Sequence, residues 1–300
     1  MQIRETIGGQ APVPVEPRMT VNPALMAKKV FLALPWQKNT NPITAFSMAN
    51  LLDRRRMTAC LNFGDAFVAH SRNTCADLFL KSPAEYMLML DDDVVLPGHA
   101  GWYNAFTGFN LPEKFAGMNV LDRLLSHNKK LIGGLYFGKH KHGKPMYGEG
   151  VGYKNEEDYA RTAPLDLIKP TAWVATGCLL IHRDVFRDIM SRWPRLAPNA
   201  QGERSNFFTS SEDAALDAIE DCLGLLSGNK LGGETALKVL TRLEAAKQEI
   251  RIGYPLGIGE DVSFCTRAKK VGHTPYVDLG LVLGHIGTEI YGPKNTFRRE

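Results

Sequence analysis

The stretch Tyr86–Pro97 reads YMLMLDDDVVLP. Its first five residues are all apolar, which predicts a short strand buried on both faces. Three aspartates, Asp91, Asp92 and Asp93, follow this strand directly. In open α/β sheets ligands bind beyond the carboxyl ends of the strands, so this stretch predicts both the fold and the place of a site.

The three adjacent carboxylates repel one another, and a hard divalent cation would remove that conflict. Mg²⁺ and Mn²⁺ prefer oxygen ligands, and one or two carboxylates plus substrate phosphates often hold them. In an extended segment Asp91 and Asp93 point to one side and Asp92 to the other. The pair is therefore expected to share one metal ion, although an acidic turn or helix start would show the same letters.

Other apolar stretches predict further strands, at residues 29–34, 130–137, 173–182 and 274–283. Helical spacing appears at 42–56 and at 65–80, where Ser71 is a candidate N-cap. Strands that alternate with helices predict the α/β class, with a mixed, mostly parallel Rossmann-like sheet flanked by helices.

Two segments differ from this pattern. Residues 1–27 contain four prolines and a Gly-Gly pair, which predicts an extended or disordered arm. Residues 211–250 carry two amphipathic helical patterns separated by glycines, which predicts a helical hairpin inserted near 211–250. Such a hairpin could pack on the sheet, form a dimer surface or clamp an acceptor.

Composition and charge exclude several classes. The chain has 300 residues and a formal net charge of +4, a mild preference for anionic ligands that is far from that of a dedicated nucleic-acid binder. Its five cysteines form no CxxC pair, so a disulfide framework or structural zinc site is not expected. Without a signal-peptide core or an apolar run of about 18 residues, a cytoplasmic protein with no membrane span is expected.

Two carboxylates and a histidine near the C-terminus are further candidates. Glu260 and Asp261 precede a helical pattern, where they could favour the helix start or supply a general base. His285 lies between glycines in LGHIG, where it could reach a metal or phosphate or serve only the structure.

Two basic segments are also candidates for anion binding. Residues 70–73 read HSRN near a helix start, so that Arg72 and backbone amides could meet a nucleotide. Residues 139–142 read KHKH, with Lys144 close behind, and this run is either a solvated loop or a means to neutralise phosphate.

The order of these motifs resembles that of the GT-A-fold, family-2-like glycosyltransferases of bacteria and their phages. The matching pieces are VFLALP at 30–35, SRN at 71–73, YMLMLDDDVVLP at 86–97, GGLY at 133–136, ATGCLLIHRDVF at 175–186, GEDVSFCTRAKKVGH at 259–273 and GHIG at 284–287. Residues 187–256 depart from the family pattern because they are longer and more helical. The resemblance implies one catalytic domain over 28–300, with the nucleotide-sugar part at about 28–140 and the acceptor part at about 141–300.

The resemblance also implies roles for single residues. Asp91 and Asp93 correspond to the DXD motif that holds Mn²⁺ or Mg²⁺ on the donor diphosphate, and His285 to a histidine that completes the metal shell. Asp261 corresponds to the base of inverting members, although the GED motif leaves Glu260 as an alternative. The implied donor contacts are Leu34, Pro35, Arg72, Asp91, Asp92, Thr176 and Gly177.

The expected activity is therefore transfer of a hexose from a nucleotide sugar, with a UDP-sugar as the first candidate. The acceptor would be a glycan, a protein or a hydroxymethylated base in phage DNA, and a homo-oligomer is compatible with the sequence. The alternative is a haloacid-dehalogenase-like phosphatase, because LMLDDDVV also fits its D-x-D-x-V motif with Asp91 as nucleophile. The late position of that motif in the chain, and the remaining matches, favour the transferase.

Overall fold

A computed structural model describes part of the chain: residues 24, 27–36, 42–48, 51, 57–63, 67–96, 118–139, 146, 148, 168–198, 205–209, 219, 221–224, 233–251, 259–287 and 290–291. The arm expected at 1–27 lies almost entirely outside the described residues, and so does most of the basic run that begins at Lys139. No helix among the described residues has the length and apolar character needed to cross a bilayer.

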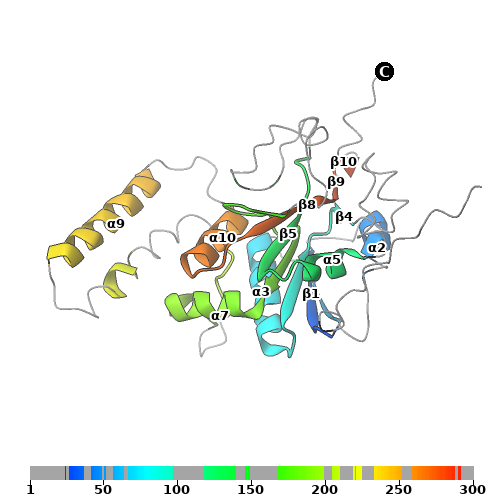
Figure 1. The fold of residues 1–300 in the computed structure, drawn as a ribbon, viewed down its shortest axis with the longest axis horizontal. Helices are drawn as coiled ribbons and strands as arrows, with labels where there is room; N and C mark the ends of the chain where they lie inside the picture. The colour runs from blue at the N-terminus through cyan, green and yellow to red at the C-terminus, as the bar shows by residue number, and fades with distance from the viewer. Residues whose placement is uncertain are drawn as a thin grey trace, which may run out of the picture.

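The core of the fold is a seven-stranded mixed sheet, which confirms the expected α/β class (Figure 1). Its strand order is β2 (Met57–Phe63), β1 (Val30–Trp36), β3 (Tyr86–Leu90), β7 (Cys178–His182), β5 (Leu131–Leu135), β8 (Tyr276–Val282) and β6 (Ile168–Pro170). The pairings β1–β2, β1–β3 and β5–β8 are parallel, whereas β7 runs against both its neighbours and β6 runs against β8. Five strands therefore point in one direction, and their carboxyl ends meet at one edge.

Helices cover both faces of this sheet. On one face α3 (Val68–Lys81), α7 (Arg183–Arg192), the 3-10 turn η3 (Pro194–Leu196) and α10 (Glu260–Lys270) bury one apolar cluster. On the other face α2 (Pro42–Met48) and α5 (Val120–Ser126) bury a second. In β1, Phe31 and Ala33 join the first cluster and Leu32 and Leu34 the second, because side chains alternate along a strand. A continuous apolar run is what a strand covered on both faces requires.

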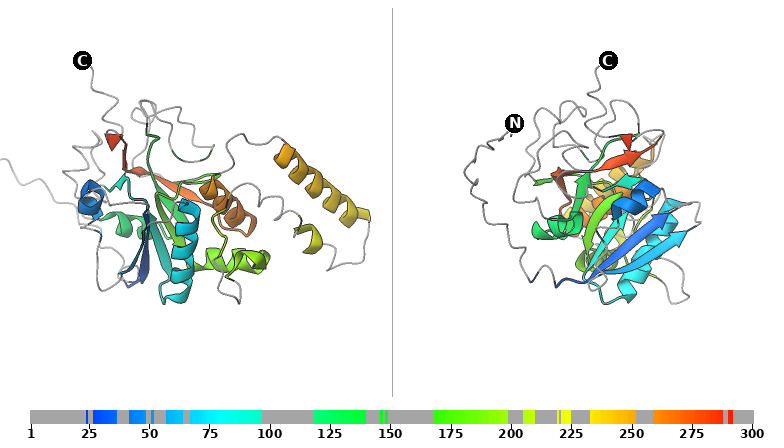
Figure 2. Two further views of the ribbon diagram at one scale, coloured as in Figure 1. Left: turned by 180° about the vertical axis from the view of Figure 1, so that it is seen from behind. Right: turned by 90° about the vertical axis from the view of Figure 1, so that its right-hand side faces the viewer.

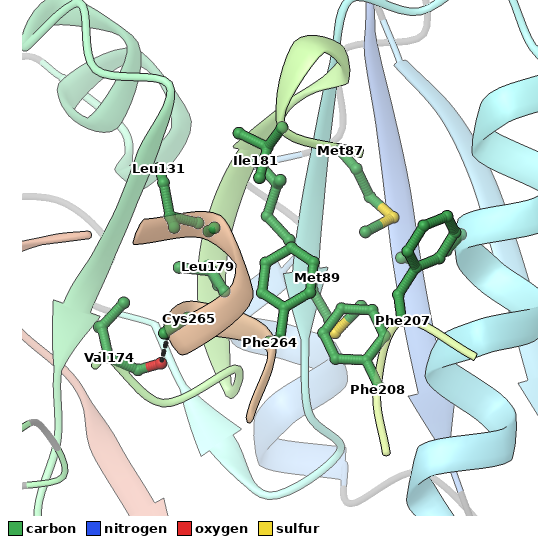
Figure 3. Packing of buried hydrophobic residues seen from close by; sticks show 14 of the residues in the cluster. Met87, Met89, Leu131, Val174, Leu179, Ile181, Phe207, Phe208, Phe264 and Cys265 are labelled. Atoms are coloured by element: carbon green, nitrogen blue, oxygen red, sulfur yellow. Dashed lines mark hydrogen bonds between the residues drawn. The ribbon is translucent and has the colours of Figure 1, made fainter. Parts of the chain in front are cut away.

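Aromatic side chains fix α10 against the sheet (Figure 3). Phe264 is fully buried, and its ring stacks on Phe208 with a centroid distance of 4.5 Å and an interplanar angle of 18°. The neighbouring Cys265 thiol donates to the Val174 carbonyl, with sulfur and oxygen 3.6 Å apart. The N-terminus of α10, which carries Glu260 and Asp261, therefore has a defined position.

Most elements confirm the sequence predictions, with differences at their ends. The expected helix at 42–56 is described as a helix only over Pro42–Met48, and strand β2, which follows the predicted helix directly, was not predicted. Helix α3 begins at Val68 with Phe67 as its N-cap, so the expectation of a cap at Ser71 is wrong. Ser71 lies inside the first turns and is buried.

The predicted helical segment near 211–250 contains α9 (Gly233–Arg251). Figures 1 and 2 show α9 apart from the helices that cover the sheet, so the expectation that it packs on the sheet is not met. Its Val239 is buried, and the Val239 carbonyl accepts from the Cys222 thiol of the preceding helical segment. Leu237 and Leu240, in contrast, are exposed.

Candidate functional site

The sequence-predicted residues gather at the edge where the parallel strands end. Asp91 follows β3, Tyr136 follows β5, and the antiparallel strand β7 begins just after Gly177 at the same edge. The first turns of α3 and α10 add Arg72 and Asp261. Residues far apart in sequence therefore share one site, at the position where open α/β sheets bind ligands.

Arg72 joins two carboxylates at the centre of this site. Its Nη2 donates to both oxygens of Asp91 at 2.9 Å, and its Nη1 donates to Glu260 Oε1. The Arg72 side chain is only 5% exposed. Burial opposes the charged guanidinium, but Asp91 and Glu260 outweigh this effect and raise the Arg72 pKa. Arg72 thus connects α3, β3 and α10 through a permanent positive charge.

Among the described residues, Asp91 and Asp93 contact different side chains, whereas the prediction from an extended segment had both point to one side. The chain turns after β3, and the Val94 amide donates weakly to the Asp91 carbonyl at 3.5 Å. Asp92 lies in this turn and is partly buried. Because a turn breaks the alternation of an extended chain, Asp91 reaches Arg72 while Asp93 faces another group.

A small second sheet brings Asp93 against His285. Strand β4 (Val94–Val95) pairs antiparallel with β9 (Gly284–Ile286), which also pairs with β10 (Ile290–Tyr291), and Val94 lies opposite His285. The Ile286 amide donates to the Asp93 carbonyl at 2.7 Å. As a result His285 Nε2 lies 3.5 Å from Asp93 Oδ1.

The hydrogen bond made by Nδ1 of His285 determines which tautomer the neutral ring adopts. Nδ1 lies 2.7 Å from the Phe137 carbonyl oxygen, which can only accept, so Nδ1 carries a proton. In the neutral ring Nε2 then carries the lone pair that a metal ion would need, whereas in the protonated ring Nε2 donates to Asp93. A histidine oriented by a backbone carbonyl in this way is a common arrangement for metal ligands.

Asp93 also has a basic neighbour. Lys139 Nζ donates to Asp93 Oδ2, the oxygen that does not face His285. Burial alone would raise the Asp93 pKa, but the protonated form of His285, the only form whose Nε2 can donate here, and Lys139 outweigh burial and keep the pKa below its usual value. The carboxylate is therefore stabilised in its charged form.

Two of the three predicted metal ligands have side chains placed to bind a divalent cation together. Among the described residues, no three His, Cys, Asp or Glu side chains gather into a metal site. Asp93 and His285 offer one oxygen and one nitrogen donor, whereas Asp91 is engaged by Arg72. Two protein ligands suffice for Mn²⁺ or Mg²⁺ when substrate phosphates supply others, so the pair fits such an ion.

Glu260 and Asp261 have different surroundings although they are neighbours. Glu260 pairs with Arg72. Asp261 Oδ1 accepts from the Val262 amide at 2.7 Å. Burial and the nearby charge of Glu260 raise the Asp261 pKa, and these effects outweigh the amide hydrogen bond and Arg72. Of the two, Asp261 is the carboxylate more suited to accept a proton.

Tyr136 is a site residue that sequence reasoning did not single out, although GGLY was one of the matching motifs. Its hydroxyl oxygen accepts from the Gly177 amide at 3.1 Å, and its ring meets His285 edge-on at 5.0 Å. A Cβ at position 177 would lie 2.5 Å from that hydroxyl oxygen, so only glycine allows this contact. The adjacent Thr176 is buried, and its hydroxyl has no hydrogen-bond partner among the described residues.

Leu34 and Pro35 lie on β1, beside β3, and both are buried. Leu34 packs in the cluster that also contains Leu90 and Tyr136, below the site. Their contact with a nucleotide base stays a prediction.

Comparisons with known proteins add little to this geometry. No protein-family model matches the chain, and no curated protein matches it. A solved structure titled "Crystal Structure of A197 from STIV" matches with 13% identity, 89% coverage of this chain and 91% of that chain, at a TM-score of 0.43. We draw no conclusion about function from a likeness at this level.

Proposed function

We propose that the protein is a metal-dependent glycosyltransferase that moves a sugar from a nucleotide sugar, first of all a UDP-sugar, to an acceptor hydroxyl with inversion. The observation that carries this proposal is that Asp93 Oδ1 lies 3.5 Å from His285 Nε2, the ring nitrogen that carries the lone pair when the histidine is neutral. A Mn²⁺ or Mg²⁺ ion held by this pair would stabilise the negative charge of a departing nucleoside diphosphate.

The neighbouring side chains have distinct parts in this proposal. Asp261 takes the proton of the acceptor hydroxyl, since a carboxylate with a raised pKa is a stronger base than an ordinary one. Glu260 does not compete for this role because its carboxylate is held in an ion pair with Arg72. Arg72 also holds Asp91 in place, so it acts on the donor side of the site through that carboxylate.

The phosphatase alternative receives less support from the same contacts. Its nucleophile would be Asp91, whose two oxygens both accept from Arg72. A carboxylate held by a buried guanidinium has a stabilised charge and is a weaker nucleophile. Asp93, its proposed acid/base partner, is turned toward His285 and Lys139 instead.

The test combines a substrate panel with one substitution. The protein is incubated with Mn²⁺ and a set of nucleotide sugars, with and without glycan, protein and hydroxymethylated-DNA acceptors, and release of the nucleoside diphosphate is measured. At least one donor should be turned over, and only with the divalent ion. Asp261→Asn should keep donor binding but reduce transfer by roughly 10²–10⁴-fold, the usual contribution of a general base.

Asp188→Asn is the matched control, because Asp188 is exposed on α7, where its carboxylate contacts His273. It should transfer sugar at the wild-type rate. Equal rates in Asp261→Asn and wild type would reject Asp261 as the base. Absence of any divalent-dependent nucleotide binding would reject the proposed function itself.

A further inference from the structure

The carboxylate proposed to bind a divalent ion already has a cationic partner. Lys139, in the segment after β5, places its ammonium on Asp93 Oδ2. The Lys139 side chain is 41% exposed and that of Asp93 29%. The other carboxylate oxygen faces His285 Nε2. The single negative charge of Asp93 is thus balanced before any metal ion arrives.

We infer that the Lys139 ammonium pairs with the Asp93 carboxylate in the ligand-free protein, at the place where the divalent ion would bind. As a result, binding of the divalent ion and binding of the nucleoside diphosphate depend on each other. This inference rests on the proposed function, since it concerns the same pair, Asp93 and His285. It adds a role for a residue that the sequence assigned only to a solvated or phosphate-neutralising loop.

Charge balance gives the physical reason. With Lys139 on Asp93, a divalent ion at the pair brings three positive charges around one carboxylate, and their repulsion weakens binding of the ion alone. A diphosphate supplies further negative charge, so ammonium and metal ion both gain partners. Lysine suits this exchange because its compact charge sits on a flexible stem and binds phosphate well.

The exchange costs little because the ammonium is partly solvated. Ion pairs this exposed contribute little to stability, so Lys139 can leave Asp93 with little loss of fold stability. By linkage, the factor by which the diphosphate tightens metal binding equals the factor by which the metal tightens diphosphate binding. Removal of Lys139 should therefore change both affinities in a related way.

The test measures Mn²⁺ affinity by electron paramagnetic resonance, with and without UDP, for wild type, Lys139→Met and Lys139→Arg. Lys139→Met should bind Mn²⁺ alone about tenfold more tightly than wild type, and UDP should enhance its Mn²⁺ binding less, within the usual range of such couplings. Lys139→Arg keeps the charge and should remain close to wild type.

Lys130→Met is the matched control. Lys130 precedes β5 at the opposite end of the strand and pairs with Asp184, so the variant loses the same charge away from the site. It should bind Mn²⁺ like the wild type.

The failures of the two proposals are distinguishable. If wild type binds Mn²⁺ with UDP but Lys139→Met binds Mn²⁺ alone no more tightly, the role of Lys139 is overturned and the metal site stands. If no variant binds Mn²⁺ with or without UDP, the metal-dependent function fails, and the inference with it.

Discussion

Asp278 is a fully buried carboxylate that supports an irregularity in the sheet. The pairing of β5 with β8 shifts register between Gly134 and Leu135. Asp278 Oδ1 accepts from the Gly280 and Leu281 amides at 2.9 and 3.1 Å. The carboxylate thus satisfies amides at the shift, beyond which the chain continues into β9 and His285.

The charge of Asp278 is balanced by two side chains near the end of α5. Arg123 donates to its two oxygens at 2.6 and 2.7 Å, and His127 Nε2 lies 2.8 Å from Oδ2. Burial opposes ionisation, but the hydrogen bonds from His127 and Arg123 outweigh it and lower the Asp278 pKa. A carboxylate with a lowered pKa stabilises the folded state at neutral pH.

Asp278→Asn should therefore reduce the free energy of unfolding by about 3–5 kcal/mol at neutral pH, because it leaves a buried guanidinium without its counter-charge. The stabilisation is fully present above the unfolded pKa of about 3.9 and is lost as the pH falls through the lower folded pKa. Urea denaturation at about pH 7, 5 and 3.5 should show a constant difference between variant and wild type at the first two values and a smaller one at the third.

Asp184→Asn is the control for this measurement, because Asp184 is partly exposed and pairs with the exposed Lys130. It should cost less than about 1 kcal/mol. A cost for Asp278→Asn as small as that of Asp184→Asn would contradict the role assigned to the buried group.

At the residue scale the sequence predicted which side chains gather but not how they pair. Asp91, Asp93, Asp261 and His285 all lie at the expected edge of the sheet. The pairing of Arg72 with Glu260 joins positions 188 residues apart, and no local periodicity contains such a contact. Asp91 and Asp93 contact different side chains because the chain turns between them, and three consecutive aspartates in the sequence do not predict that turn.

At the element scale, α10 and α9 differ in how much apolar surface they bury. Phe264 on α10 is fully buried among Phe186 and Phe208, with ring centroids 5.4 and 4.5 Å away. Leu240 on α9 is 63% exposed. Since burial of apolar area stabilises the fold, α10 contributes to the core that holds the site and α9 contributes little.

Phe264→Ala should accordingly lower the free energy of unfolding by about 3–5 kcal/mol through the cavity it leaves. Leu240→Gln, which keeps a good helix former, should change it by no more than about 0.5 kcal/mol. Chemical denaturation of both variants checks this difference. A loss in Leu240→Gln as large as that in Phe264→Ala would show that α9 is part of the folded core.

Strong apolar runs made β1, β3 and β7 predictable, whereas weaker patterns concealed other elements. Strand β2 lies between the predicted helices at 42–56 and 65–80 and was missed, because Thr58 and Asn62 interrupt its apolar residues and it lies at the sheet edge. The pairing of β4 with β9 involves only two or three residues per strand, too few for any periodicity. That short pairing nevertheless brings Asp93 to His285.

At the scale of the whole molecule, the site exists only when the entire sheet is formed. Its residues extend in sequence from Arg72 to His285 and come from α3, α10 and the ends of several strands. The unfolded chain separates them, so a ligand that needs all of them binds the folded state alone. Such a ligand raises stability by mass action.

UDP and Mn²⁺ together should therefore raise the melting temperature more than the sum of their separate effects. At about 100 times the dissociation constant a ligand adds about 2.7 kcal/mol, which corresponds to roughly 5 °C for a domain of this size. Differential scanning fluorimetry measures the shift. Asp93→Asn should lose the Mn²⁺-dependent part, because it removes the charge that faces His285, while Asp188→Asn should keep it. A Mn²⁺-dependent shift of equal size in Asp93→Asn would mean that the ion binds elsewhere and that the pair at this edge is not the metal site.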